Sequence, residues 1–139
     1  MRFLLGWLKK LTGNKNSAQK FPGIVTAKVM KVEKHPNADR LRVVELTDGQ
    51  GTISPVVCGA WNFEAGAIVA LARPGAVILH NQHDPAGKSF VVGKAKIRGI
   101  ESQGMICSAK ELGIGDDGSG IMILKPDTKL GQEFSRAML

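Results

Sequence analysis

Cysteine and histidine are the side chains of this sequence that could bind a transition metal or act as nucleophiles. The chain has two cysteines, Cys58 and Cys107, and three histidines, His35, His80 and His83. A tetrahedral zinc site needs four ligands that are held rigidly. No CxxC pair occurs, and His80 and His83 fall in a polar stretch with Asn, Gln, Asp and Pro. We therefore predict no metal site, and we expect both cysteines to be reduced, small, buried apolar side chains.

Glycines recur in the stretch 113–120, which could in principle cradle a phosphate. A phosphate-binding loop is followed by Lys and then Ser or Thr, and this one is not. Asp116 and Asp117 would also repel a phosphate. No GxSxG motif and no conspicuous carboxylate pair occurs elsewhere in the chain. The stretch is interpreted as an acidic turn, and the sequence predicts no catalysis by this chain alone and no cofactor.

Three cations alternate along residues 94–98. Lys94, Lys96 and Arg98 are spaced two apart, so that in an extended strand they project from one face. Such a stripe is most often a solvated surface. The segment that follows favours binding, because it offers glycines for close backbone approach and small hydrogen-bonding side chains: Gly99, Ser102, Gln103, Gly104 and Ser108.

A second polar segment, residues 35–41, reads His-Pro-Asn-Ala-Asp-Arg-Leu. Pro36 fixes one backbone angle, and Asn37 and Asp39 can hydrogen-bond the local backbone, which is typical of a structured turn. The turn would then deliver Arg40 and Arg42 to one side of the strand that follows it.

Short strands separated by glycine-containing turns must position these residues. We expect strands at 24–32, 40–46, 52–58, 67–72, once or twice within 88–98, and at 121–124, with one helical turn at 108–112. Pro55 lies within the third of these, which indicates an edge strand or a bulge. Asp48 and Gly49 mark a tight turn. The spacing predicts a mainly β fold, either a small closed barrel or a sandwich.

Length and composition indicate one ordinary globular domain. The chain has 139 residues, of which 43% are hydrophobic and 22% are charged. The formal net charge is +7, but residues 1–20 carry five basic side chains and no acid. The other 119 residues carry 14 basic and 12 acidic side chains. The high net charge therefore says little about the body of the domain.

The N-terminal segment 1–20 has a different pattern. Apolar residues recur at helical spacing opposite a basic face, which predicts a short amphipathic helix followed by a polar linker. The helix could pack against the domain or a partner, or it could lie on a membrane surface. No apolar run reaches the roughly 20 residues that a membrane span needs. A membrane partner is therefore not expected, and the predicted location is cytoplasmic.

Five sequence pieces occur in one order: HPNADRLRVVEL at 35–46, VVCGAWNFEAG at 56–66, ARPGAVI at 72–78, KIRGIESQGMICSAKELGI at 96–114 and GIMIL at 120–124. They resemble the tRNA-binding domain at the start of the bacterial phenylalanine–tRNA ligase β subunit. The same domain is found in free-standing tRNA-binding proteins. The resemblance implies an oligonucleotide-binding (OB) fold over residues 21–138, which is a five-stranded antiparallel barrel with a small extra subdomain.

The resemblance also implies a tRNA-related role and a set of RNA-facing residues: Asn37, Arg40, Arg42, Lys94, Lys96, Arg98, Ser102, Met105 and Ser108. Of these, Asn37, Arg98, Ser102 and Met105 fall on motif letters, whereas the lysines are inferred from charge and alternation. The family usually has Pro where this chain has Trp61. Trp61 could stack on a base or could simply pack against the domain, and both interpretations stay open.

Two functions are consistent with these observations. The first is a non-catalytic module that binds the tRNA backbone through a basic barrel face, either as the N-terminal region of the ligase β subunit or as a stand-alone relative. The second is a docking domain for synthetase subunits or for a homodimer partner, with little RNA contact. The nearly balanced charge of the domain body favours the second function, and the cation stripe favours the first.

Overall fold

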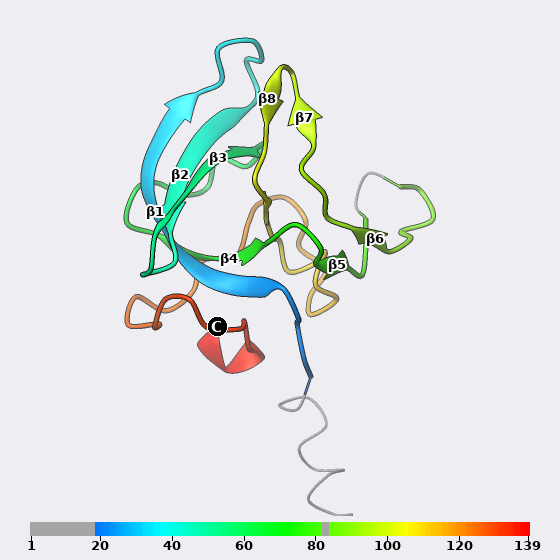
Figure 1. The fold of residues 1–139 in the computed structure, drawn as a ribbon. Coiled ribbons are helices and arrows are strands. Elements are labelled where there is room, and N and C mark those ends of the chain that lie inside the picture. Colours follow the sequence, from blue (N-terminus) through cyan, green and yellow to red (C-terminus); the bar gives the residue numbers. More distant parts are fainter. Residues whose placement is uncertain (1–18, 82–83) are drawn as a thin grey trace, which may run out of the picture.

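The computed structural model describes residues 19–81 and 84–139 (Figure 1). The expected N-terminal amphipathic helix lies outside these residues. The described part is mainly β, with one short 3-10 helix: β1 (Ile24–Lys34), β2 (Arg42–Thr47), β3 (Thr52–Cys58), β4 (Ile68–Ala72), β5 (Val77–Ile78), β6 (Phe90–Val91), β7 (Lys96–Ile97), β8 (Ile100–Glu101), β9 (Met105–Ile106) and η1 (Arg136–Met138).

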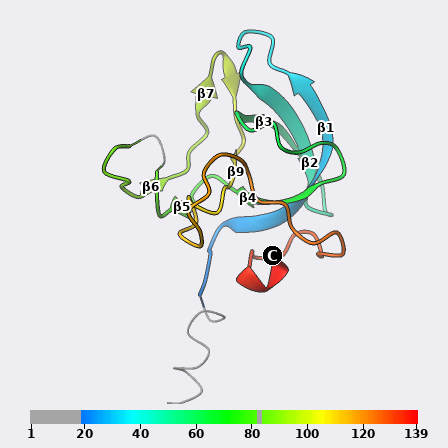
Figure 2. The same cartoon turned by 180° about the vertical axis from the view of Figure 1, so that it is seen from behind.

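Five strands form one antiparallel sheet in the order β3-β2-β1-β4-β9. The long strand β1 pairs with β4 through its first five residues and with β2 through its second half. A register shift between Val29 and Lys31 marks a bulge between those halves, and bulges bend a strand. The sheet therefore curls into a half-barrel, which Figures 1 and 2 show from opposite sides.

The predicted five-stranded antiparallel architecture is confirmed as this curled sheet. Within the described residues no strand ladder joins the edge strands β3 and β9. The segment between β8 and β9 spans this gap with two hydrogen bonds. Gln103 N donates to Pro55 O at 2.8 Å, and Val57 N donates to the Ser102 hydroxyl at 2.9 Å. The expectation for Pro55 is also confirmed, because β3 is an edge strand that can accommodate a missing N–H.

The prediction of a strand at residues 121–124 is wrong. This segment forms single backbone hydrogen bonds, from Met122 N to Cys107 O and from Leu124 N to Ile68 O, but it has no strand geometry. The fifth place in the sheet belongs to β9, which has only two residues. The predicted helical turn at 108–112 is a set of hydrogen-bonded turns ending at Gly113, where φ is +70°.

Two apolar clusters form the core, and β4 contributes to both. Val69 and Leu71 pack with buried side chains of β1, β2 and β3, whereas Ile68 and Ala70 pack with a second cluster. That cluster includes the C-terminal segment, which is held by the edge-on contact of Phe134 with Phe21 at 5.1 Å between ring centroids. Alternating side chains of a strand point to opposite faces, so β4 is buried on both.

Two small antiparallel sheets, β5–β6 and β7–β8, lie beside the main sheet. The β7–β8 hairpin and the β1–β2 turn lie at one end of the molecule, which we call the hairpin end, and η1 lies at the opposite end (Figure 1). Both cysteines are buried and unpaired, as expected. No helix in residues 19–81 and 84–139 is long and apolar enough to cross a membrane.

Candidate nucleic-acid interface

The β7–β8 hairpin places Arg98 at its tip. Ile97 pairs with Ile100, which leaves Arg98 and Gly99 as the two-residue loop. Their φ angles are +52° and +92°, and a type I′ turn needs positive φ at both positions. Gly99 adopts a positive φ without steric cost. Among the described residues, Arg98 is the only one other than glycine with a positive φ. The turn holds the Arg98 side chain in solvent.

The β1–β2 turn, residues 35–41, is fastened to this hairpin by three hydrogen bonds. His35 Nδ1 accepts from Asn37 N at 2.9 Å, so the proton of the neutral ring lies on Nε2, which donates to Ile97 O at 3.1 Å. Arg98 Nη2 donates to Asn37 O at 3.2 Å, and Asn37 Nδ2 donates to Arg98 O at 3.5 Å. Two distant polar segments of the sequence therefore form one surface, with His35 buried beneath it.

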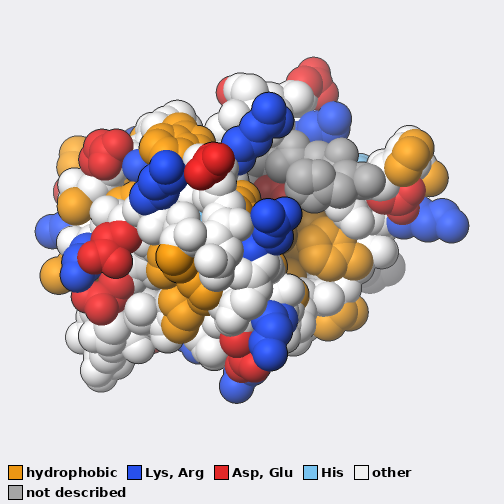
Figure 3. Space-filling model, turned by 90° about the horizontal axis from the view of Figure 1, so that it is seen from above, with side chains coloured by type: hydrophobic (Ala, Val, Ile, Leu, Met, Phe, Trp, Pro, Cys, Tyr) orange, Lys and Arg blue, Asp and Glu red, His pale blue; other side chains and the backbone are white. Residues whose placement is uncertain are grey.

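Four cations of the predicted set are exposed around this surface, namely Arg40, Lys94, Lys96 and Arg98. None of the four forms an ion pair with any described residue. Acidic residues are close by. Lys96 lies opposite Glu101 in the register of the β7–β8 hairpin, and Lys34 forms an ion pair with Asp39 at 3.6 Å. Figure 3 looks onto the hairpin end and shows Lys and Arg interspersed with Asp and Glu. The charge of this surface is locally positive and discontinuous.

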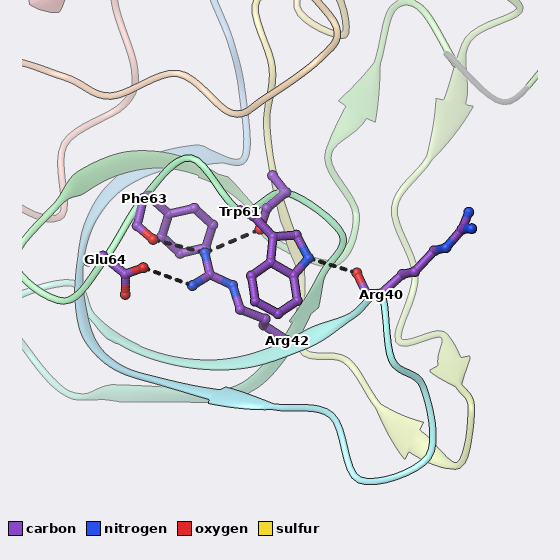
Figure 4. Close-up of polar contacts among 6 residues, drawn as sticks. Arg40, Arg42, Trp61, Phe63 and Glu64 are labelled. Carbon is purple, nitrogen blue, oxygen red and sulfur yellow. Dashed lines mark hydrogen bonds and ion pairs between the residues drawn. The ribbon is translucent and has the colours of Figure 1, made fainter.

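The structure places Arg42 inside the domain. The residue is 4% exposed, and its guanidinium lies between two aromatic rings, 4.7 Å from the Trp61 centroid and 4.6 Å from the Phe63 centroid (Figure 4). Nη2 donates to Phe63 O at 2.8 Å and to Ala60 O at 3.3 Å, and Nη1 lies 3.2 Å from a carboxylate oxygen of Glu64. This guanidinium is committed to the protein, so we leave it out of the proposed RNA-facing set.

Trp61 covers Arg42 and is itself largely exposed. The indole Nε1 donates to Arg40 O at 3.0 Å, which fixes the ring against the β1–β2 turn (Figure 4). The residue nevertheless keeps 54% of its surface accessible. Both interpretations from the sequence therefore have support, because one face of the ring packs on Arg42 while much of the side chain remains in solvent.

Two serines of the predicted set are also buried. Ser102 Oγ accepts from Val57 N and donates to Gly104 O at 2.8 Å, so it connects β3 to the β8–β9 segment. Ser108 and Glu111 form a reciprocal pair, in which Glu111 N donates to Ser108 Oγ and Ser108 N donates to the Glu111 carboxylate. We assign both serines a structural role. The S-x-x-E spacing of a capping box could have revealed the second pair.

A cleft of about 720 Å³ opens beside the hairpin. Its lining is largely apolar or small and includes Phe90, Val92, Ile97 and Met105, with Glu111 as a buried carboxylate. Met105, which the resemblance placed toward RNA, is half-buried in this lining. No sequence motif marks the cleft, because its walls come from six separate segments. Lys94, Lys96 and Arg98 lie outside its lining.

The described residues contain no cluster of side chains that could bind a metal ion. No group of three or more His, Cys, Asp or Glu side chains converges there. Burial raises the pKa of the Cys58 and Cys107 thiols, so neither is held as the reactive thiolate at neutral pH.

The family model described as "Putative tRNA binding domain" matches residues 24–133, and the chain belongs to this family. The match covers β1 to β9 and most of the C-terminal segment that packs on β1.

The curated relatives are phenylalanine–tRNA ligase β subunits. The chain is 43% identical over 120 residues to that of Chlorobaculum tepidum, covering 85% of this chain and 14% of the relative. It is 50% identical over 109 residues to that of Syntrophotalea carbinolica, covering 78% and 12%. A match of 37% identity to the subunit of Dechloromonas aromatica covers 95% of this chain and 18% of the relative. The chain thus spans less than a fifth of the length of these relatives.

Proposed function

We propose that this chain is a non-catalytic tRNA-binding module that contacts the sugar–phosphate backbone through its hairpin end. The observation that carries this proposal is the set of three hydrogen bonds that fasten the β1–β2 turn to the β7–β8 hairpin. They fasten the turn that carries Arg40 to the hairpin that carries Arg98, two segments nearly 60 residues apart in the sequence. Membership of the tRNA-binding family supplies the class of ligand.

The expected mode of binding is electrostatic. Exposed Lys and Arg side chains neutralise phosphates and release condensed counterions, so the affinity falls as salt increases. Four separated cations interspersed with acids give weak, shape-tolerant binding, and we expect dissociation constants in the micromolar range. Asn37 is the member of the predicted set that offers an exposed amide at this surface.

The proposed role in an enzyme is indirect. The relatives are subunits of an aminoacyl-tRNA synthetase, and this chain corresponds to a small part of each. We propose that it acts as such a subunit's tRNA-binding region, or as a stand-alone relative of it, and makes no bond itself. We propose a cytoplasmic location, as expected from the sequence, because a tRNA-binding role is consistent with it.

Charge reversal at the hairpin end tests the proposal. In the intact chain, we expect K94E/K96E/R98E to lower tRNA affinity by at least tenfold, because three phosphate contacts become repulsive. Each lost phosphate contact should also reduce the slope of log affinity against log salt by about 1. Fluorescence anisotropy with labelled tRNA measures both quantities.

The matched control is K125E/K129E/R136E. These exposed cations lie on the C-terminal segment, at the opposite end from the hairpin, and they give the same change in net charge. The proposal requires the control variant to retain clearly more affinity than the hairpin variant, with both melting at the wild-type temperature. Equal losses in the two variants would show that net charge, not this surface, governs binding.

An exposed apolar pair favours docking as the second candidate function. Val77 and Val91 face each other across β5 and β6 and are 49% and 64% exposed, with Leu79 nearby in sequence at 43%. Such a patch is typical of a surface that meets another protein subunit or a second copy. If the wild-type chain sediments as a dimer and V77S/V91S as a monomer, docking is supported. A monomer at all concentrations removes the homodimer version of this function.

A further inference from the structure

The Trp61 ring is held rigidly at the surface of the hairpin end. Its Nε1 donates to Arg40 O at 3.0 Å, and the Arg42 guanidinium lies beneath the ring at 4.7 Å from the centroid. Arg42 is in turn fixed by two backbone carbonyls and by the Phe63 ring on its far side (Figure 4). A ring held in this way loses little further conformational entropy when a ligand stacks on it.

The outer face of the ring is free to make such a contact. Arg42 covers one face, yet 54% of the residue remains accessible, the largest exposed fraction of any aromatic side chain in the described residues. The Arg42 contact uses one face of the indole and the hydrogen bond to Arg40 O uses its Nε1 edge, so neither contact occupies the opposite face. An aromatic ring with an uncovered face at a surface offers a platform on which a base can stack.

The surroundings of the ring favour a nucleotide as the occupant. Arg40, whose carbonyl accepts the indole hydrogen bond, carries an exposed guanidinium that points away from the ring (Figure 4). The same turn continues to Asn37 and its contact with Arg98. A base on the ring would therefore leave its phosphates close to a turn that carries a free cation. Single-stranded nucleic acids are bound by this combination of stacking and cationic contacts.

We propose that Trp61 is a stacking platform for one unpaired base of the bound RNA. The inference rests on the proposed tRNA-binding function and adds to it a contact with a base, where that function involves only the backbone. Stacking on an indole tolerates every base, because each has a π-face, so Trp61 would increase affinity without reading sequence.

Fluorescence of Trp61 tests the contact directly. The chain has two tryptophans, so W7F leaves Trp61 as the only one. The probes are unfractionated tRNA, an oligoadenylate of about 12 nucleotides, within the range of about 4–16 that one such domain binds, and an abasic oligomer of the same length. We expect tRNA and oligoadenylate to quench Trp61 emission and the abasic oligomer, which has phosphates but no bases, to leave it unchanged.

Substitution supplies the second measurement. W61L keeps an apolar side chain over Arg42 but removes the π-face, and W61F keeps a smaller one. We expect W61L to bind oligoadenylate about 5- to 150-fold more weakly than wild type and W61F to lie between them. Affinity for the abasic oligomer should be the same in all three. If W61L lowers the melting temperature, the quenching measured in W7F decides the question alone.

The outcomes separate this inference from the proposed function. Anisotropy that shows RNA binding, with unchanged Trp61 emission and wild-type affinity in W61L, would refute stacking and leave the tRNA-binding function standing. Equal quenching by the abasic oligomer would also refute it, because only the backbone would then touch the ring. If Trp61 emission changed with protein concentration in the absence of RNA, the ring would be a contact between copies of the chain, and the stacking proposal would be refuted. Failure of every RNA to bind at low salt would overturn both proposals.

Discussion

Arg42 is a cation whose two Nη groups bond inside the domain, while its Nε is buried without a hydrogen-bond partner. Its guanidinium satisfies the carbonyls of Ala60 and Phe63 and fills the space between Trp61 and Phe63. Removing it leaves the buried Phe63 carbonyl without its donor, which costs about 1–3 kcal/mol, and the partly buried Ala60 carbonyl also loses a weaker contact. We therefore predict that R42A lowers the free energy of unfolding by about 2–4 kcal/mol, measured by urea denaturation.

Glu64 provides the comparison for Arg42. Its side chain is 78% exposed, and ion pairs with such exposed partners contribute little, about 0–1 kcal/mol. E64Q should therefore change stability much less than R42A. If E64Q and R42A were equally destabilising, the ion pair and not the carbonyl contacts would be the important interaction.

Asp48 makes stability depend on pH. Backbone N–H groups of Gln50 and Gly51 donate to its carboxylate and hold its pKa below the ordinary value of 3.8. A carboxyl with a lowered folded-state pKa stabilises the protein above its unfolded pKa, and this contribution is lost as the pH falls through the folded one. We predict that D48N is less stable than wild type near neutral pH and that the gap closes from about pH 5 to about pH 2. A gap that stays constant with pH would show that the charge is irrelevant.

At the scale of elements, four of the main strands could be predicted because they are long enough to show a pattern. The segments around β1, β2, β3 and β4 have runs of Val, Ile and Leu bounded by turn residues. β9 could not be predicted, because two residues carry no periodicity. Residues 121–124 have the composition of a strand but form only single backbone hydrogen bonds, to Cys107 and Ile68.

The candidate site was predictable only in part, for a related reason. Lys94, Lys96 and Arg98 are exposed, but the extended strand that their alternation predicts covers only Lys96 and Ile97, and Arg98 lies in the hairpin turn. The same reasoning could not separate Arg40 from Arg42, two neighbours of like charge. Their different exposure depends on Trp61 and Phe63, which approach from about 20 residues further along the chain.

Gly104 allows β9 to join the sheet. A Cβ at this position would lie 2.5 Å from the backbone oxygen of Ala72, the last residue of β4. The clash is with backbone, so the strands must separate, and overpacking of this kind costs about 1–3 kcal/mol. We predict that G104A lowers the melting temperature. G66A is the control, because Gly66 also has a positive φ, +99° against +158° at Gly104, but a Cβ there meets nothing within 4 Å. A G104A variant as stable as G66A would contradict the close approach.

At the scale of the whole molecule, most of the basic excess lies outside the domain body. Five of the 19 basic residues occur among residues 1–20, where there is no acid. A test of RNA binding must therefore separate this arm from the hairpin end. Replacing its five basic residues with Gln in the intact chain (R2Q, K9Q, K10Q, K15Q and K20Q) removes the charge of the arm and leaves the domain unchanged.

The salt dependence of tRNA binding by this five-Gln chain decides whether the domain body binds RNA through its cations. Four backbone contacts predict a slope of about −3 in log affinity against log salt, so that binding weakens by about 60-fold between about 50 and about 200 mM salt. We expect the five-Gln chain to keep this slope and micromolar binding at low salt. No detectable binding at low salt, or an affinity that does not change with salt, would contradict the proposal that the hairpin end is an RNA-backbone surface.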